Sequence, residues 1–209
     1  MNRETLCIGP CLLLALLLGW SGAWASEWKR VEWVDDGDTV VVSGGVRVRY
    51  IGVNAPEVAH KERSAERFGP EARAFNRKLV FHKKVRLELG REEHDQYGRL
   101  LAYVFLKDGT FVNAELVNGG YGHCLFQRPN TKYDEQLLGL QREAMEKRVG
   151  LWEGFVDEKG PYVGNRETRR FHRAGCPFGK TVSPRNRVLL KTRYDAFWHG
   201  FSPCKRCKP

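Results

Sequence analysis

The stretch that decides the fold runs from Val34 to Glu57 and reads VDDGDTVVVSGGVRVRYIGVNAPE. Its valine-rich runs are separated by two tight-turn sequences, Asp36-Gly37 and Ser43-Gly44-Gly45, which is the pattern of short antiparallel strands. Successive side chains of a strand point to opposite faces, so Arg49 lies opposite to its apolar neighbours. The segment therefore predicts three strands of a small sheet, with an arginine set among carboxylates.

Outward from this stretch, strand-like and helix-like patterns alternate. We expect strands over residues 28–34, 39–42, 46–53, 85–89, 100–106 and 188–191, and helices opening at 68–71, over 112–117, over 133–148 and from the capping box at 192–195 to Gly200. Up to residue 156 this order favours a β-rich α+β domain, namely a five-stranded OB-fold barrel with three packed helices. Periodicity alone leaves other small sheet arrangements open.

The first 25 residues have the features of a targeting segment. Arg3 precedes the apolar run Leu12–Leu18, and Ala23-Trp24-Ala25 has the A-x-A form of a cleavage site. We expect a signal peptide over residues 1–25, cut after Ala25, and a secreted or periplasmic protein. An uncleaved anchor is the alternative, but the run is short for a bilayer span. No later segment predicts a stable membrane span.

The formal charge of +10 is unevenly distributed. Residues 26–156 hold 21 Lys and Arg against 20 Asp and Glu, whereas residues 157–209 hold 13 against four. Helical periodicity also stops near Asp157, so we predict a main domain over 26–156 and a basic C-terminal module over 157–209. Such a module attracts nucleic acid by neutralising phosphates, without reading the base sequence.

Four polar side chains of the main domain have the chemistry that phosphodiester hydrolysis needs. A carboxylate must take a proton from water, and fixed cations must stabilise the charged transition state. Glu57 would be the base, and Arg49 and Arg99 the cations, because a guanidinium grips phosphate oxygens in pairs. Asp38 would hold a divalent metal ion. Each residue alone is more simply a turn or surface residue, but their combination favours an enzyme.

The span from Val31 to Trp152 resembles the thermonuclease, or staphylococcal-nuclease-like, family. The matching motifs are VDDGDT at 34–39, RYIGVNAPE at 49–57, FGPEA at 68–72, DQYGRLLAY at 95–103, Asn113, Leu116, Val117 and GLW at 150–152. The resemblance implies an OB-fold barrel with three helices and calcium-dependent cleavage of DNA and RNA. It also implies 3′-phosphate products.

The resemblance further implies a role for each site residue. These roles are general base for Glu57, phosphate binding for Arg49 and Arg99, metal ligation for Asp38, Asn54 and the Ala55 carbonyl, and support behind the metal for Asp36. Asn54 replaces an aspartate of the family, so calcium should bind less tightly, or another divalent ion should serve. Leu125 and Gln127 replace two tyrosines of the nucleotide pocket in the best-known member. We expect a monomer that needs no small-molecule cofactor.

The basic module carries a second cluster, formed by His172, Cys176, Cys204 and Cys207. His-x3-Cys followed by Cys-x2-Cys has the ligand types and spacing of a structural zinc site. The segment GFSPCKRC at 200–207 resembles the zinc module of Ada-type DNA alkylation-repair proteins. His172 stands where that family has its methyl-accepting cysteine, so methyl transfer is not expected. A disulfide from Cys176 to Cys204 or Cys207 is the alternative in an exported chain.

The leading interpretation is therefore an exported, metal-dependent nuclease whose basic module assists nucleic-acid binding. The main alternative is a non-catalytic OB-fold module that binds nucleic acid or a protein. The presence of Arg49, Glu57 and Arg99 together favours the enzyme. A charge-based membrane tether is a third reading, and it lacks a lysine-rich amphipathic helix.

Overall fold

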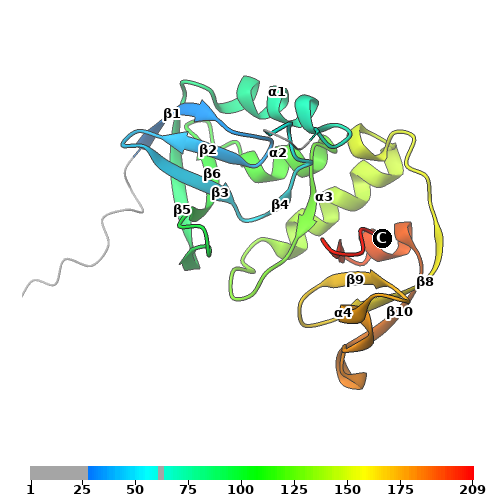
Figure 1. Ribbon diagram of the computed structural model, residues 1–209. Helices are drawn as coiled ribbons and strands as arrows, with labels where there is room; N and C mark the ends of the chain where they lie inside the picture. Colours follow the sequence, from blue (N-terminus) through cyan, green and yellow to red (C-terminus); the bar gives the residue numbers. More distant parts are fainter. Residues whose placement is uncertain (1–27, 61–63) are drawn as a thin grey trace, which may run out of the picture.

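The computed structural model describes residues 28–60 and 64–209 (Figure 1). The predicted signal peptide and its cleavage site after Ala25 lie outside the described residues. Within the described part of the chain, no helix combines the length and apolar character needed to cross a membrane.

The main domain is a closed five-stranded barrel. Its strands, in order around the barrel, are β1 (Trp28–Val34), β2 (Thr39–Val42), β3 (Val46–Tyr50), β6 (Leu100–Leu106) and β5 (Lys84–His94). Of the five pairings, that of β3 with β6 is parallel and the others are antiparallel. This closed five-stranded arrangement confirms the predicted OB-type barrel.

Alternating valines fill the interior of the barrel. Val31, Val34, Val40, Val42 and Val48 are each no more than 1% exposed. Because strand side chains alternate between faces, the intervening residues point outward and are largely polar. The valine pattern thus fixes the register in which charged side chains reach the rim.

Three helices pack against the barrel, as the sequence predicted. They are α1 (Gly69–Val80), α2 (Val112–Asn118) and α3 (Asp134–Lys147). Asn113 of α2 is fully buried, where its Oδ1 accepts the Val104 N–H and its Nδ2 donates to the Ile51 carbonyl. These two bonds attach α2 to β6 and to the end of β3.

The single strand predicted over residues 46–53 is wrong, because the structure divides it. After β3 the chain forms β4 (Gly52–Asn54), which leaves the barrel and pairs with β7 (His123–Leu125). Gly52 makes the break with a φ of 80°, a conformation that favours glycine. Hydrophobic alternation continues across the break, so periodicity alone cannot reveal it. The break turns the loop that carries Glu57 across the end of β3.

The C-terminal module is a four-stranded sheet with short helices. Its strands run in the order β10 (Arg187–Thr192), β8 (Lys159–Asn165), β9 (Arg170–Arg173) and β11 (Ser202–Pro203), and its helices are α4 (Pro177–Lys180) and α5 (Arg193–Trp198). Short 3₁₀ turns lie at η2 (Gly150–Trp152) and η3 (Pro184–Asn186). The predicted cap is confirmed, since the Asp195 N–H donates to Thr192 Oγ1 at 3.0 Å. Strands β8, β9 and β11 were not predicted, because β9 and β11 are short and β8 contains two glycines and a proline and lacks clear alternation.

The C-terminal module shares a core with the main domain and lies beside α3 (Figure 1). The rings of Phe197 and Trp152 are 5.2 Å apart between centroids. Gln141 of α3 is 1% exposed; it accepts the Cys124 N–H and donates to the Phe197 carbonyl, both at 2.6 Å. The Ser202 hydroxyl donates to the Cys124 carbonyl. The core therefore crosses the predicted 156/157 boundary, and that division remains a prediction.

Gly52→Ala is expected to destabilise the protein more than the matched change Gly44→Ala. Both glycines have positive φ, but a Cβ at Gly52 would lie 2.5 Å from Leu137 Cδ1, whereas nothing lies within 4 Å at Gly44. Backbone strain costs about 1–2 kcal/mol at either position, and overpacking adds about 1–3 kcal/mol at Gly52 alone. Thermal unfolding measures both; equal losses of Tm would contradict the expectation.

Candidate active site

Side chains from the barrel rim and its loops line a cleft of about 350 Å³. The predicted site residues that line it are Asp36, Asp38, Arg49, Asn54, Glu57 and Arg99. They come from the β1–β2 turn, from β3, from β4 with its following loop, and from the β5–β6 turn. Ala55, also predicted, is buried directly behind Asp38. The fold thus brings together residues that are far apart in the chain.

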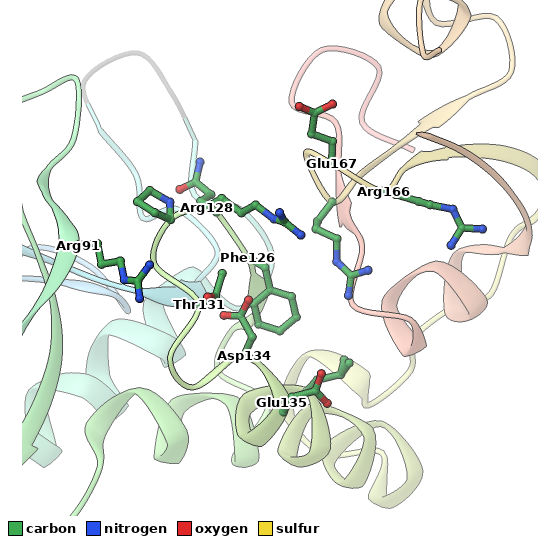
Figure 2. Close-up of a pocket in the computed structure, with 12 residues that line it drawn as sticks. Arg91, Phe126, Arg128, Thr131, Asp134, Glu135, Arg166 and Glu167 are labelled. Carbon is green, nitrogen blue, oxygen red and sulfur yellow. The ribbon is translucent and has the colours of Figure 1, made fainter. Parts of the chain in front are cut away.

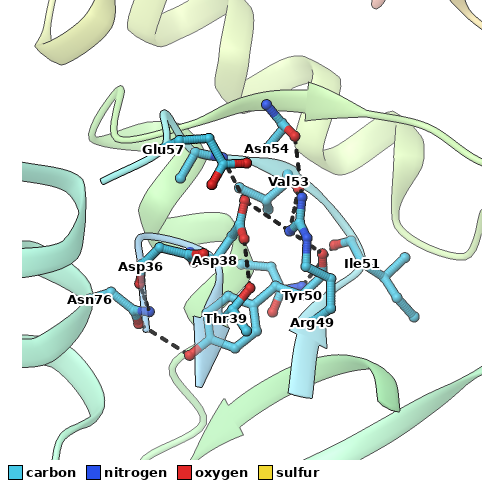
Figure 3. A network of polar contacts seen from close by, with 12 residues as sticks. Asp36, Asp38, Thr39, Arg49, Tyr50, Ile51, Val53, Asn54, Glu57 and Asn76 are labelled. Atoms are coloured by element: carbon cyan, nitrogen blue, oxygen red, sulfur yellow. Dashed lines mark hydrogen bonds and ion pairs between the residues drawn. The ribbon is translucent and has the colours of Figure 1, made fainter. Parts of the chain in front are cut away.

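Asp38 lies at the centre of the polar network in Figure 3. Its Oδ2 is 2.9 Å from Arg49 Nη1 and accepts the Ala55 N–H at 2.7 Å, while its Oδ1 accepts the Thr39 hydroxyl at 3.0 Å. Burial raises the pKa of Asp38 to about 7, although Arg49 acts to lower it and Asp36 to raise it. Because burial disfavours the charged carboxylate, a cation placed beside it would restore the charge.

Arg49 is 9% exposed, and most of its donors are used inside the protein. Nη1 donates to the carbonyls of Tyr50 at 3.1 Å and Val53 at 2.8 Å, and Nη2 donates to Asn54 Oδ1 at 3.3 Å. Among the described residues, Nε–H has no acceptor. The Nε–H and the second N–H of Nη2 therefore form the edge that can bind an anion.

Arg99 is held in the cleft by Asp95, which was not predicted as a site residue. Arg99 Nε donates to Asp95 Oδ2 at 2.7 Å, and Asp95 Oδ1 accepts the Arg99 and Tyr97 amides. Burial raises the pKa of Asp95, but the amide and side chain of Arg99 and the Tyr97 amide outweigh it, so the net pKa is lowered. Arg99 Nη1 also lies 3.4 Å from Thr39 Oγ1, which links it to the Asp38 network.

Asn54 forms a second unpredicted pair, with His123. Asn54 Nδ2 is 3.3 Å from His123 Nε2, and His123 Nδ1 is 3.0 Å from the Cys124 carbonyl. The tautomer that satisfies both contacts carries its hydrogen on Nδ1, so Nε2 accepts from the amide and the Asn54 oxygen faces Arg49. An aspartate at position 54 could not donate to a neutral imidazole. The amide and the neutral His123 therefore suit each other.

Glu57 lies exposed at the edge of the cleft (Figure 3). Glu66 holds its backbone. The Glu57 N–H donates to Glu66 Oε2 at 3.2 Å, and its carbonyl accepts the Glu66 N–H at 2.9 Å. Its carboxylate makes no hydrogen bond or ion pair with the described residues. Asp36 lies behind Asp38, since its Oδ1 accepts the Asp38 N–H at 2.9 Å.

A second cavity of about 710 Å³ adjoins the cleft where the module meets the main domain (Figure 2). Its basic lining residues are Arg91, Arg128, Arg166 and Arg169. Gln127 and Arg128 line both cavities, so the two lie next to each other. Burial raises the pKa of Asp134 in this cavity to about 6, although Arg169 and Arg128 act to lower it. Because Asp134, Glu135 and Glu167 also line it, the cavity carries charges of both signs beside the cleft.

The predicted His/Cys cluster is assembled in the module. The ligand atoms of His172, Cys176, Cys204 and Cys207 all lie within 4.8 Å of one another. His172 Nδ1 is 3.6 Å from Cys176 Sγ, and tetrahedral zinc with ordinary Zn–N and Zn–S bonds separates such atoms by about 3.6 Å. The cysteines of the described residues are free thiols, so the structure holds no disulfide between them and favours the metal site over that alternative.

The fold and the cleft together define a class. Guanidinium groups and carboxylates at the rim of an OB barrel are suited to binding a phosphodiester and activating water. The class is that of an OB-fold nuclease.

Comparison with known proteins agrees with this class. The staphylococcal nuclease homologue family matches residues 47–154, and the metal binding domain of Ada matches residues 158–209. The Thermonuclease of Staphylococcus intermedius is 39% identical over 126 residues, which are 59% of this chain and 74% of the relative. The Thermonuclease of Staphylococcus hyicus is 36% identical over 137 residues, which are 64% of this chain and 80% of the relative. Endonuclease YncB of Bacillus subtilis (strain 168) is 35% identical over 136 residues, which are 63% of this chain and 62% of the relative.

The chain belongs to the staphylococcal nuclease homologue family, and it is a nuclease hydrolase with a C-terminal domain of the Ada metal-binding type. Both resemblances predicted from the sequence are thereby confirmed.

His123 is expected to make the folded protein sensitive to mild acid. Burial, and then Arg170 and Arg49, lower the pKa of His123 from 6.5 to about 4. Between these values the unfolded chain binds the proton and the folded chain does not, so stability falls as the pH falls through this window. The Tm advantage of the native protein over His123→Gln should therefore shrink from pH 7 to pH 4. His94→Gln, at an exposed strand end, is the control; a constant advantage would contradict the assignment.

Proposed function

We propose that this chain is an exported, divalent-metal-dependent nuclease of DNA and RNA, in which Glu57 is the general base and Arg49 and Arg99 stabilise the phosphate. The observation that carries this proposal is the shared cleft of these three side chains. Export rests on the sequence of residues 1–25 and on the A-x-A site that ends at Ala25.

The proposed roles follow from which groups are committed to other contacts. Glu57 has an exposed carboxylate without a partner among the described residues, so it can accept a proton from an attacking water. Arg49 offers its Nε edge to a phosphate while its other donors hold the site together. Arg99 approaches from a separate segment and is oriented by Asp95. Fixed cations in a partly buried cleft stabilise developing phosphate charge more strongly than they would in water.

The oxygens of Asp38, Asn54 and the Ala55 carbonyl fit a hard divalent ion such as calcium. The fit is supported by the buried Asp38 carboxyl, whose pKa burial raises to about 7 even though Arg49 pairs with it, so a further cation beside it would favour the charged form. In the described residues, the His/Cys cluster is the one group of three or more His, Cys, Asp or Glu side chains gathered tightly enough for a metal. The calcium-type ion would therefore use amide, carbonyl and water oxygens beside Asp38. When bound, it supplies positive charge and orients water.

Glu57→Gln is expected to lower kcat by about 10²-fold or more, because a general base contributes at least that much. Its fold should be retained, since the carboxylate has no internal partner. Arg49→Lys should also lose most activity, because lysine keeps the charge and lacks the planar fork. Plasmid DNA and RNA should be assayed with calcium, magnesium, manganese or a chelator.

The matched control for Glu57→Gln is Glu93→Gln, an exposed carboxylate outside the cleft. Wild-type rates for Glu57→Gln would refute the assigned base, and full activity in chelator would refute metal dependence. A folded native protein that binds but never cuts nucleic acid would support a non-catalytic OB-fold module.

We also propose that His172, Cys176, Cys204 and Cys207 bind one structural zinc ion. Burial raises the pKa of the Cys176 thiol, but the backbone amides of Gly179 and Phe178 and the thiols of the cluster outweigh it, so the pKa is lowered. A lowered thiol pKa favours the thiolate, which is the form that binds metal.

Elemental analysis should find one zinc per chain, and His172→Ala should lose it and lower the Tm. His94→Ala, outside the cluster, should keep the metal. Thiol titration of denatured, chelated protein should count every cysteine of the mature chain. If the titration finds two thiols fewer and elemental analysis finds no zinc, the cluster forms the disulfide from Cys176 to Cys204 or Cys207 instead.

A further inference from the structure

The C-terminal module places two cations in the nuclease cleft. Arg170 opens β9, and Lys205 lies between Cys204 and Cys207; both line the same cleft as Arg49. Neither falls within residues 47–154, which the nuclease family matches. We propose that Arg170 and Lys205 form a second phosphate-binding subsite, which holds a phosphate of the substrate strand next to the one being cleaved. This inference rests on the proposed function.

Arg170 is a half-buried guanidinium without a compensating carboxylate. Its Nη1 donates to the Pro203 carbonyl at 3.1 Å, and none of the ion pairs among residues 28–60 and 64–209 includes it. A partly buried cation is costly unless it is paired. A substrate phosphate would supply the missing partner.

The environment of Arg170 makes an anion more favourable still. Arg170 and Arg49 both line this cleft. Two like charges at the wall of one cleft repel each other, and an anion between them relieves that repulsion.

Lys205 is exposed, and its loop is held by backbone bonds. The Cys204 N–H donates to the Phe171 carbonyl and the Lys208 N–H donates to the Cys204 carbonyl, both at 3.0 Å. The ammonium group makes no hydrogen bond or ion pair with the described residues. Lys205 is therefore available to substrate, while the loop that carries it stays next to β9.

The test uses point variants of the full chain. Truncation near Asp157 would uncover Gln141 and the apolar side chains that the module buries, and would confuse lost folding with lost binding. Arg170→Gln and Lys205→Gln remove one cation each. Arg206→Gln is the matched control, because Arg206 is exposed, lies 5.6 Å from the Phe178 ring and does not line the cleft.

Steady-state cleavage of a single-stranded oligonucleotide should show KM raised about tenfold in Arg170→Gln and in Lys205→Gln, with kcat little changed. Contacts away from the reacting phosphate add to the binding of substrate and transition state equally, and their loss appears in KM. Binding of the same oligonucleotide, measured by anisotropy in a Glu57→Gln background, should lose about 0.7 of its log Kd–log salt slope per variant. Arg206→Gln should match the parent in both measurements.

The subsite is refuted if Arg170→Gln and Lys205→Gln behave like Arg206→Gln. If Arg170→Gln fails to fold because it loses the Pro203 bond, Lys205→Gln decides alone, since the Lys205 ammonium makes no hydrogen bond or ion pair within residues 28–60 and 64–209. Failure of the proposed function looks different, because Glu57→Gln would then cleave at the parent rate. An inactive Glu57→Gln with unchanged Lys205→Gln overturns the subsite and leaves the nuclease assignment standing.

Discussion

The buried ion pair between Asp38 and Arg49 joins the fold of this nuclease to its site. Asp38 is 4% exposed and Arg49 is 9% exposed, so each charge depends on the other for compensation. The same guanidinium binds the carbonyls of Tyr50 and Val53, on either side of the break between β3 and β4. The interaction that neutralises Asp38 therefore also shapes the loop that leads to Glu57.

The cleft contains one buried acid, Asp38, and one half-buried base, Arg170, which favour ligands of opposite charge. Burial raises the pKa of Asp38 although Arg49 pairs with it, and burial lowers the pKa of Arg170, so a further cation would favour the charged carboxylate and an anion would favour the charged guanidinium. An added cation alone would stabilise the Asp38 carboxylate and repel the Arg170 guanidinium. An added anion alone would stabilise Arg170 and repel Asp38. A divalent ion bound together with a phosphodiester satisfies both, which is the combination that the proposed hydrolysis requires.

The sequence predicts best those features of the fold and site that depend on local residue patterns. Alternating valines predicted the barrel strands, and separated motifs predicted that Arg49, Glu57 and Arg99 converge, because those motifs carry the turns that aim them. Contacts created by tertiary packing were missed. His123 lies on a short strand that pairs only with β4, and its contact with Asn54 joins residues 69 positions apart. Asp95 begins the motif DQYGRLLAY at 95–103. Its position four residues before Arg99 could have indicated that its carboxylate orients the Arg99 guanidinium.

The two family domains behave structurally as one body, and this gives the zinc-type cluster an influence on the cleft. Arg170 stands two residues before His172 on β9, and Lys205 stands between two cysteines of the cluster. An ion bound by the four ligands would therefore be held by the same strand and loop that carry both cations. The shared core around Gln141 keeps that ordered module against the barrel, because its bonds to Cys124 and Phe197 link strand β7 to helix α5. Residues of the domain that matches one family thus line the cleft of the domain that matches the other.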